Sequence, residues 1–194
     1  MSEYENGRVR MLARSLAKQG VSDEIAAQIL ESGEKLGRRP TPEGQVAWMS
    51  EAMHRMDALL DAPTRHTVRE RCACCLGGKR LQVSRGIAKD HATLEERIRA
   101  ANEARFVFGH SVRLTEDGEV QVSFFPEGQP HYRCVCLPAA KEPISITYCY
   151  CCGGHVKHHL QIALGRKLEM TVRSSALASG GTEPCAFTFR MVGR

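Results

Sequence analysis

Sulfur and imidazole side chains are concentrated in one short stretch of this sequence. Residues 147–159 have the order Thr-Tyr-Cys-Tyr-Cys-Cys-Gly-Gly-His-Val-Lys-His-His, which holds three cysteines, two glycines and three histidines. Thiolates and imidazoles are the side chains that bind zinc, copper(I) and iron–sulfur clusters. Cys134 and Cys136 precede this stretch, and Cys185 follows it near the C-terminus. A fold that uses these side chains together must bring distant segments to one point.

The number of cysteines also indicates the kind of chemistry. The chain has nine cysteines, an odd number, so they cannot all pair within one molecule. The N-terminal residues 1–6 are acidic and lack the basic and then apolar order of a signal peptide. We therefore expect a cytoplasmic protein, because thiols stay reduced in that compartment. Cysteines there predict metal or redox chemistry rather than structural disulfides.

Composition argues against some classes of protein. At 194 residues, with 42% hydrophobic and 25% charged residues, the chain suits one ordinary globular domain with a helical extension. No apolar run approaches the roughly 20 residues that cross a bilayer, so no membrane association is expected. Lysine and arginine are dispersed and the net charge of +5 is mild, so nucleic-acid binding is not expected either.

The N-terminal half of the sequence has the spacing of amphipathic helices. Apolar residues recur every three or four positions, and Ser22, Thr41 and Pro42 are typical of helix starts. A stripe of methionines after Thr41 predicts core packing, because the thioether fills irregular gaps. Helices are expected over residues 6–19, after Ser22, after Thr41, over 64–75 and over 90–104.

Beyond Gly109 the apolar residues alternate with a period of two, which is typical of strands. Asp117-Gly118 predicts the turn of a first hairpin. Further strands are expected over 131–137, 144–151, 168–174 and 185–192, with a helix over 153–164. This order predicts an α+β fold, an antiparallel sheet with packed helices preceded by an N-terminal helical region. Residues 1–104 would form that helical region on the same core, and residues 105–194 the α+β domain that carries the cysteine cluster.

The spacing of the cysteines predicts how they meet. Cys134 and Cys136 are two apart on an expected strand, so both face the same way, and Cys149 and Cys151 do likewise. If the two strands pair as a hairpin, opposed positions lie about 5 Å apart, which would let four thiolates surround one zinc ion. Metal binding is the preferred interpretation, beside reduced structural thiols and thiol redox or covalent chemistry.

A third group of cysteines ends the helix expected over residues 64–75. Cys72 and Cys75 are three apart and share a helical face, with Cys74 between them. Two interpretations stay open for this group. One is burial as small hydrophobic side chains, and the other is participation in a metal or redox site.

The segment after the central cysteines adds two histidines. Gly153-Gly154 predicts a tight turn from strand to helix, with backbone N–H groups at the helix start that would lower the pKa of nearby thiols. His155 and His159 are four apart on the helix that follows, which suits a metal pair or a general base. Solvent-facing or packed histidines are the alternative.

The C-terminal half of the chain resembles a known family. The likeness is carried by Cys149 and Gly154, residues 163–167, residues 172–181 and the closing Cys185-Ala-Phe-Thr-Phe. These segments resemble the 4-vinyl-reductase-like small-molecule-binding domain, which includes sensor domains of phenol-responsive regulators. The closing Cys-x-Phe-x-Phe is also similar to the 2-aminothiazoline-4-carboxylate hydrolase family. The cysteine pattern as a whole is similar to uncharacterised cysteine-rich prokaryotic proteins.

In the resembled sensor domains a zinc ion is held by a Cys, a Glu and two further Cys. The resemblance implies Cys149 as the first ligand and Cys185 as the last. The middle positions fall near Ser174 and Ser175, which cannot replace those ligands. The nearest candidates for the missing ligands are Cys134, Cys136 and Cys151, followed by Cys72, Cys74 and Cys75.

Three functions follow as hypotheses. The first is a zinc-binding, small-molecule-binding or sensor-like domain that takes a small apolar or aromatic ligand and holds zinc, or another soft metal, with its cysteine cluster. The second is a hydrolase with Cys152 as nucleophile and His155 as base. The third is a thiol redox or soft-metal sensor. The sequence leaves the oligomeric state open, a homodimer included.

Overall fold

The computed structural model describes residues 4–125 and 129–193. In chain order its elements are α1 (Gly7–Lys18), α2 (Asp23–Ile29), the 3₁₀ turn η1 (Gly33–Lys35), α3 (Pro42–Leu59), α4 (Ala62–Arg71), α5 (Gly78–Asp90), α6 (Leu94–Glu103), α7 (Arg105–Phe108), β1 (Ser111–Leu114), β2 (Val120–Ser123), the 3₁₀ turn η2 (Ile146–Cys149), α8 (Tyr150–Leu164), β3 (Leu168–Ser174) and β4 (Ala186–Met191). Residues 1–3, on which the expectation about a signal peptide partly depends, lie outside the described residues.

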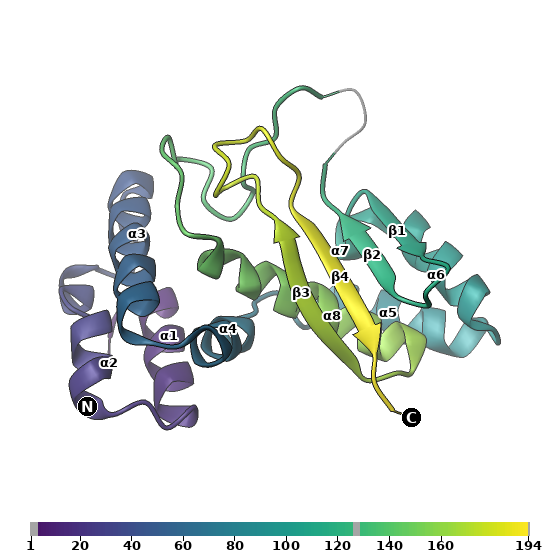
Figure 1. Ribbon diagram of the computed structural model, residues 1–194, viewed down its shortest axis with the longest axis horizontal. Helices are drawn as coiled ribbons and strands as arrows, with labels where there is room; N and C mark the ends of the chain where they lie inside the picture. Colours follow the sequence, from purple (N-terminus) through teal and green to yellow (C-terminus); the bar gives the residue numbers. More distant parts are fainter. Residues whose placement is uncertain (1–3, 126–128, 194) are drawn as a thin grey trace.

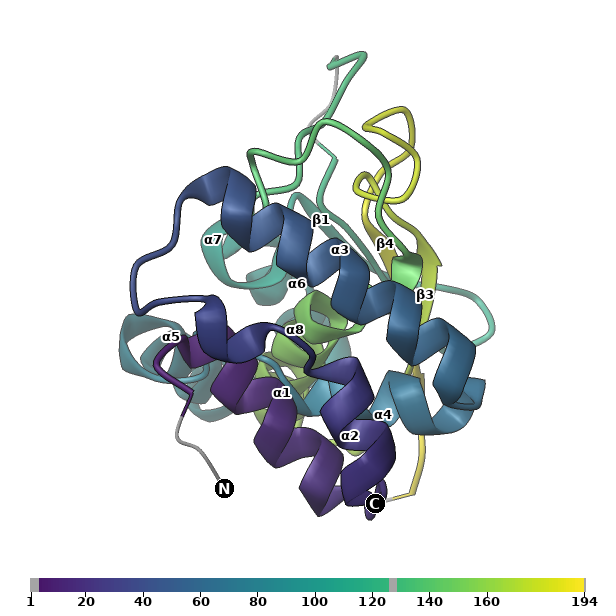
Figure 2. The ribbon, with the colours of Figure 1, turned by 90° about the vertical axis from the view of Figure 1, so that its left-hand side faces the viewer.

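The elements form two sides of the molecule. Helices α1–α4 lie on one side, and the sheet lies on the other with α5–α8 behind it (Figure 1). Figure 2, which faces the helical side, shows α1, α2, α3 and α4 packed together. Within the described ranges, every helix is too short or too polar to span a bilayer.

The N-terminal helices begin where the sequence predicted. Thr41 Oγ1 accepts a hydrogen bond from Gly44 N at 3.0 Å, with Pro42 in the first turn, and Ser22 caps α2 in the same way. The methionine stripe is confirmed as core packing. Its buried members are Met49, Met53 and Met56.

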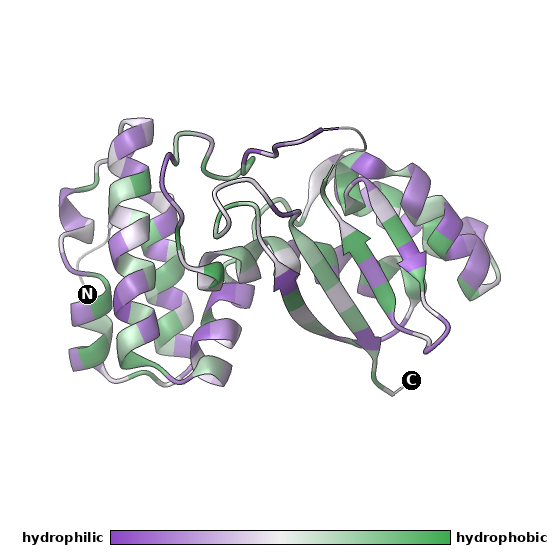
Figure 3. Ribbon diagram, turned by 45° about the horizontal axis from the view of Figure 1, so that its top comes forward, coloured by the Kyte–Doolittle hydropathy of each residue, from purple (hydrophilic) through white to green (hydrophobic). Residues whose placement is uncertain are grey.

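The strands form one antiparallel sheet in the order β1-β2-β4-β3. Residues of opposite hydropathy alternate along the strands (Figure 3), so one face of the sheet is apolar. Phe187 in β4 pairs with Val122 in β2 on one side and with Val172 in β3 on the other, and all three side chains are buried. This arrangement confirms the α+β fold, with an antiparallel sheet, packed helices and an N-terminal helical region.

Helix α8 joins the two sides, because it packs against α4, α5 and β3. Two glycines near its start permit the closest approaches. A Cβ atom on Gly153 would lie 2.1 Å from Met170 Sδ, and one on Gly154 would lie 2.4 Å from the carbonyl oxygen of Glu70. The predicted glycine turn is therefore wrong. Both glycines lie inside the helix, where they allow contact with β3 and α4.

Two predicted strands are also wrong. Residues 131–137 form an irregular loop, and residues 144–151 form η2 and the start of α8. Ser145 Oγ accepts a hydrogen bond from Thr147 N at 3.1 Å, which begins a helical turn. Residues 147–151 are buried consecutively rather than alternately, so the segment lacks the one-sided burial of a strand. The hairpin that would have opposed Cys134 and Cys136 to Cys149 and Cys151 does not exist.

Helix boundaries also differ from the sequence prediction. The helix expected over 64–75 ends at Arg71, so Cys72, Cys74 and Cys75 lie in the connection to α5, a helix that the sequence prediction missed. The helix expected from residue 90 begins at Leu94, because Thr93 and Glu96 form a capping box there.

Candidate thiol site

The nine cysteines are free thiols in segments that meet around the start of α8. Cys149 ends η2, and Cys151 and Cys152 lie in the first turn of α8. The remaining ones are Cys134 and Cys136 before η2, Cys185 before β4, and Cys72, Cys74 and Cys75 between α4 and α5. Eight of these thiols lie close enough to another thiol for that neighbour to shift their pKa. The fold thus brings sulfur from four segments together.

Cys136 and Cys152 make direct contact. Their Sγ atoms are 3.2 Å apart, and both side chains are half-buried. Arg8 holds the loop that carries Cys136, since its Nη2 donates to the Cys136 carbonyl at 3.0 Å. Nη1 of the same guanidinium donates to Tyr148 Oη at 2.9 Å. One side chain from α1 therefore fixes the loop and η2 relative to each other.

The two thiols of this pair differ in acidity. Hydrogen bonds with Cys134 and Cys152, and then the charge of Arg8, lower the pKa of Cys136. Hydrogen bonds with Cys136 and Cys151, together with burial, raise the pKa of Cys152. The pair therefore favours a thiolate on Cys136 beside a protonated Cys152. The thiolate is the nucleophilic form of cysteine.

Cys149 and Cys185 are neighbours. Cys149 Sγ lies 2.8 Å from Ser175 Oγ, and Ala176 N donates to Cys185 Sγ at 3.4 Å. The hydrogen bond with Cys185 and burial raise the pKa of Cys149, and its partner's pKa is lowered by the same contact. Ser175 therefore stands beside the first ligand of the resembled zinc site.

Arg69 places a buried positive charge among the thiols. Its side chain is 2% exposed, and its Nε atom has no hydrogen-bond partner within the described part of the chain. Nη2 donates to the Tyr148 carbonyl at 3.3 Å. The thiols of Cys151, Cys72 and Cys152 are near enough to favour the charged guanidinium. In the reverse direction, a hydrogen bond with Cys152 and then the charge of Arg69 lower the pKa of Cys151 to about 7.

His155 holds the Cys74 segment against α7. Its Nδ1 lies 3.0 Å from the Cys74 carbonyl, and its Nε2 lies 3.1 Å from the Val107 carbonyl. Both carbonyls only accept, so they favour the doubly protonated ring, whereas burial lowers the His155 pKa. Both ring nitrogens thus face backbone carbonyls in this structure. The role of general base toward Cys152 stays a prediction.

His159 holds the backbone of Cys75 in a similar way. It is fully buried, its Nε2 lies 3.1 Å from the Cys75 carbonyl, and its Nδ1 lies 2.9 Å from Ser84 Oγ. Burial lowers the pKa of His159 to about 4, so the ring is neutral near pH 7. A neutral ring carries a single N–H group, so it donates to only one of these two oxygens. The two histidines therefore fasten Cys74 and Cys75 to α8.

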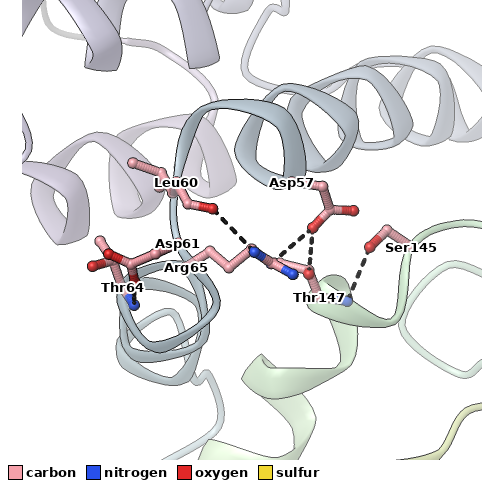
Figure 4. Close-up of polar contacts among 7 residues, drawn as sticks. All are labelled: Asp57, Leu60, Asp61, Thr64, Arg65, Ser145 and Thr147. Atoms are coloured by element: carbon pink, nitrogen blue, oxygen red, sulfur yellow. Dashed lines mark hydrogen bonds and ion pairs between the residues drawn. The ribbon is translucent and has the colours of Figure 1, made fainter.

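A polar network anchors η2 to the helical side. The hydroxyl of Thr147 donates to Asp57 Oδ1 at 2.6 Å, and Arg65 Nε reaches the same oxygen at 3.1 Å (Figure 4). Arg65 Nη1 also donates to the Leu60 carbonyl at 3.0 Å. These bonds hold η2 between α3 and α4, and so set the position from which the first turn of α8 starts.

The thiols lie near one another without surrounding a common centre. Among the described residues, no three His, Cys, Asp or Glu side chains stand where one metal ion could be held by all of them. A cavity of about 350 Å³ opens beside Cys134. Its walls include the charged residues Glu43, Arg133, Lys141 and Glu142. The small apolar or aromatic ligand expected from the sequence stays a prediction.

Several side chains of this site escaped the sequence prediction. Arg8, Arg69 and Tyr148 come from helical segments whose spacing shows nothing unusual. Ser175 was noticed only as a position that departs from the resembled zinc site. A lone arginine in an amphipathic helix is normally solvent-exposed, so the sequence holds no signal for the burial of Arg69.

Comparisons with known proteins give a family but no activity. The chain matches no curated protein and no solved structure. The resemblance to sensor and hydrolase families accordingly stays a prediction. One family is matched over residues 7–187, nearly the whole chain. The protein therefore belongs to DUF6144, a family of unknown function.

Proposed function

We propose that this protein is a thiol redox protein in which Cys136 and Cys152 form a reversible disulfide. The observation that carries the proposal is the 3.2 Å contact between their Sγ atoms. A disulfide needs the sulfurs to approach to about 2 Å. Cys152 is fixed on a helix, while Cys136 lies in an irregular loop that can supply the remaining movement. The sequence-based expectation of a cytoplasmic location fits this role, because free thiols persist there.

The reaction is thiol–disulfide exchange with a small disulfide R–S–S–R as oxidant. The Cys136 thiolate attacks one sulfur of R–S–S–R, the S–S bond breaks, and one R–S⁻ leaves. Cys152 then loses its proton and attacks the Cys136 sulfur, which breaks the mixed disulfide and releases the second R–S⁻. The protons of the two cysteines end on two R–SH molecules. Two protein thiols are oxidised and one small disulfide is reduced.

The acidities of the pair support this order of attack. Contacts with Cys134 and Cys152 and the charge of Arg8 favour the thiolate on Cys136. The raised pKa of Cys152 keeps its proton on until the mixed disulfide has formed. The nucleophile and the resolving thiol are therefore assigned by their surroundings.

Equilibration with thiol–disulfide buffers tests the proposal. Reduced protein is brought to a series of redox potentials, quenched with acid, alkylated and mapped by mass spectrometry. We expect a disulfide between Cys136 and Cys152 to form first, and Cys136→Ser to abolish it. Cys72→Ser is the matched control, because that buried thiol bonds to the Val68 carbonyl at 3.3 Å and lies outside the pair. If both residues remain alkylatable in the most oxidising buffer, the proposal fails.

Soft-metal binding, with zinc as the expected ion, is the second candidate function. The convergence of thiols at the start of α8, beside the cations of Arg8 and Arg69, favours it. Four zinc-bound thiolates would carry negative charge that the two arginines offset. The candidate ligands are Cys134, Cys136, Cys149, Cys151 and Cys185.

Metal analysis of anaerobically purified protein separates the two candidates. About one zinc per chain, with Cys136 protected from alkylation until a chelator is added, would favour the metal site. Metal-free protein with a rapidly alkylated Cys136 would favour the redox pair.

A further inference from the structure

We infer that Cys74 and Cys75 are shuttle thiols that receive a disulfide from a protein partner and pass it to Cys136 and Cys152. The inference rests on the proposed redox function, and it adds the class of substrate, a protein disulfide. The first observation is how far each cysteine is exposed to solvent. Cys74 and Cys75 are exposed, Cys136 and Cys152 are half-buried, and the other five cysteines are buried.

Exposure decides which thiols a protein disulfide can reach. The attacking sulfur must approach in line with the S–S bond that it breaks, so a folded partner reacts with thiols at the surface. A small oxidant can also reach a half-buried thiol. The exposed pair is therefore suited to a macromolecule and the half-buried pair to a small molecule.

The exposed pair lies beside the half-buried one. The end of α4 reaches α8 at Gly154, where the Glu70 carbonyl leaves no room for a side chain. From there the chain runs along α8, and the Cys74 carbonyl bonds to His155. His155 follows Cys152 by three residues, which is about one helical turn or 5 Å along the axis. Charges on Cys136 and Cys151 also reach the Cys74 thiol.

The exposed segment is held in place rather than loose. His155 Nδ1 holds the Cys74 carbonyl at 3.0 Å and His159 Nε2 holds the Cys75 carbonyl at 3.1 Å. Cys75 adopts a φ of 60°, a left-handed conformation that is uncommon for residues other than glycine. A conformation of this kind persists only where the surroundings impose it, and such positions cluster at functional sites. Two histidines of α8 therefore present both thiols at the surface, with a strained backbone at Cys75.

The transfer proceeds by three exchanges. The thiolate of Cys74 or Cys75 attacks the partner's disulfide, and one partner sulfur leaves as a thiolate. The Cys136 thiolate attacks the cysteine sulfur of this mixed disulfide and releases the second partner thiolate. Cys152 then attacks the Cys136 sulfur and frees the shuttle cysteine. The protein loses two thiol protons to the two partner thiolates, and the partner gains the two electrons.

Two oxidants of different size test the inference. The probes are oxidised protein disulfide isomerase and hydrogen peroxide. Peroxide converts Cys136 to a sulfenic acid, and Cys152 condenses with it to release water. The measurement is the rate at which the disulfide between Cys136 and Cys152 appears. Wild type is compared with the double variant Cys74→Ser/Cys75→Ser.

We expect the double variant to react about tenfold or more slowly with the isomerase and within about twofold of wild type with peroxide. Cys72→Ser is the matched control from the same segment and should keep both rates, because its thiol is buried. Equal isomerase rates in the double variant and wild type would overturn the shuttle. Parallel loss of both rates would also overturn it, because the substitutions would then have disturbed Cys136 itself.

Failure of the proposed function gives a different result. In that case wild type forms no disulfide between Cys136 and Cys152 with either oxidant. The variant Cys152→Ser adds an independent measurement, since it lacks the thiol that resolves the last step. We expect it to accumulate a disulfide from Cys136 to Cys74 or Cys75, and its absence under isomerase would count against the shuttle.

Discussion

The guanidinium of Arg69 lies over the ring of Tyr148, 4.9 Å from the ring centroid, and donates to the carbonyl of the same residue. No carboxylate forms an ion pair with Arg69 within the described residues. Burying a cation is costly unless an anion accompanies it. The nearby groups that favour its charge include the thiols of Cys151, Cys72 and Cys152. Arg69, like Arg8, is thus a feature of the fold that favours a thiolate in the cluster.

Replacing Arg69 should affect stability in a way that depends on pH. Arg69→Met keeps most of the volume and removes the charge. At about pH 9, where the Cys151 thiolate accompanies the arginine, we expect the variant to lose on the order of 1–3 kcal/mol of unfolding free energy. At about pH 6 the Cys151 thiol is protonated and the arginine lacks this anion, so the loss should shrink or reverse. Denaturant unfolding at both pH values measures the difference.

The control for this variant is Arg173→Met. Arg173 lies in β3 and its Nε donates to Thr188 Oγ1 at 2.9 Å, on the sheet rather than among the thiols. Its effect on unfolding should be the same at both pH values. An Arg69→Met loss that is equally independent of pH would show that thiolates do not accompany this arginine.

Cys151 should make the wild-type protein more stable as the pH rises. A hydrogen bond with Cys152, and then the charges of Arg69 and Arg8, lower the pKa of Cys151 from 9.0 to about 7. The folded state therefore holds this proton less tightly than the unfolded state. Its contribution to stability is complete above the unfolded pKa and is lost as the pH falls through the folded one. We expect the unfolding free energy to rise between about pH 7 and about pH 9.

Cys151→Ala should reduce that rise, as followed by denaturant unfolding in steps of pH, while Cys136 and Cys185, whose pKa values are also lowered, keep part of it. The measurement stops near pH 9.0, the pKa of an unfolded cysteine. Above that pH, thiols whose folded pKa is raised, such as Cys152, lower the unfolding free energy as the pH rises. A rise of the same size in wild type and variant would mean that another group is responsible.

Local signals explain what the sequence predicted well. Thr41 with Pro42 marks a helix start because capping depends on neighbours within one turn. Asp117-Gly118 marks the hairpin turn because glycine alone readily adopts the positive φ found at Gly118. The alternating residues of β1, β2, β3 and β4 place one face of each strand in the core. Fold class follows from such local information.

Contacts between distant segments explain what was missed. Residues 144–151 alternate enough to suggest a strand, yet Ser145 caps a helical turn and residues 147–151 are buried consecutively. Gly153 suggested a turn, whereas Met170 across the core is the reason for its small size. The contact of Cys136 with Cys152 depends on an irregular loop, and no periodicity predicts where such a loop lies. The sequence therefore identified the cysteines of the site, but not which of them are in contact.

Thr147 should matter for both stability and redox behaviour. Its buried hydroxyl donates to Asp57, so Thr147→Val leaves a carboxylate oxygen with one partner fewer. A hydrogen bond to a charged group contributes about 1.5–3 kcal/mol, and we expect a loss of that order in unfolding free energy. Because η2 sets the start of α8, the disulfide between Cys136 and Cys152 should also form more slowly. Thr67→Val is the control, because Thr67 donates only to a carbonyl of its own helix and should change stability by about 0.5 kcal/mol or less.

Gly154 tests whether the close approach of α4 and α8 positions the thiols. A Cβ atom there would lie 2.4 Å from the Glu70 carbonyl oxygen and 3.0 Å from Glu70 Cγ, so backbone must move. We expect Gly154→Ala to lower the unfolding free energy by about 1–3 kcal/mol. The same shift should move the thiols of Cys74 and Cys75 away from the first turn of α8. It should therefore slow the oxidation of Cys136 and Cys152 by a protein disulfide.

Gly86→Ala makes the same chemical change, but we expect it to raise the unfolding free energy rather than lower it. Gly86 lies inside α5, and the nearest atom to an added Cβ is Asp90 Oδ2 at 3.8 Å, an ordinary contact. Alanine in an unobstructed helix position should stabilise the protein by up to about 1 kcal/mol. Thermal and denaturant unfolding of the two variants side by side separate packing from helix propensity. If Gly154→Ala proved as stable as Gly86→Ala, the contact between the end of α4 and α8 would not be what fixes the thiol site.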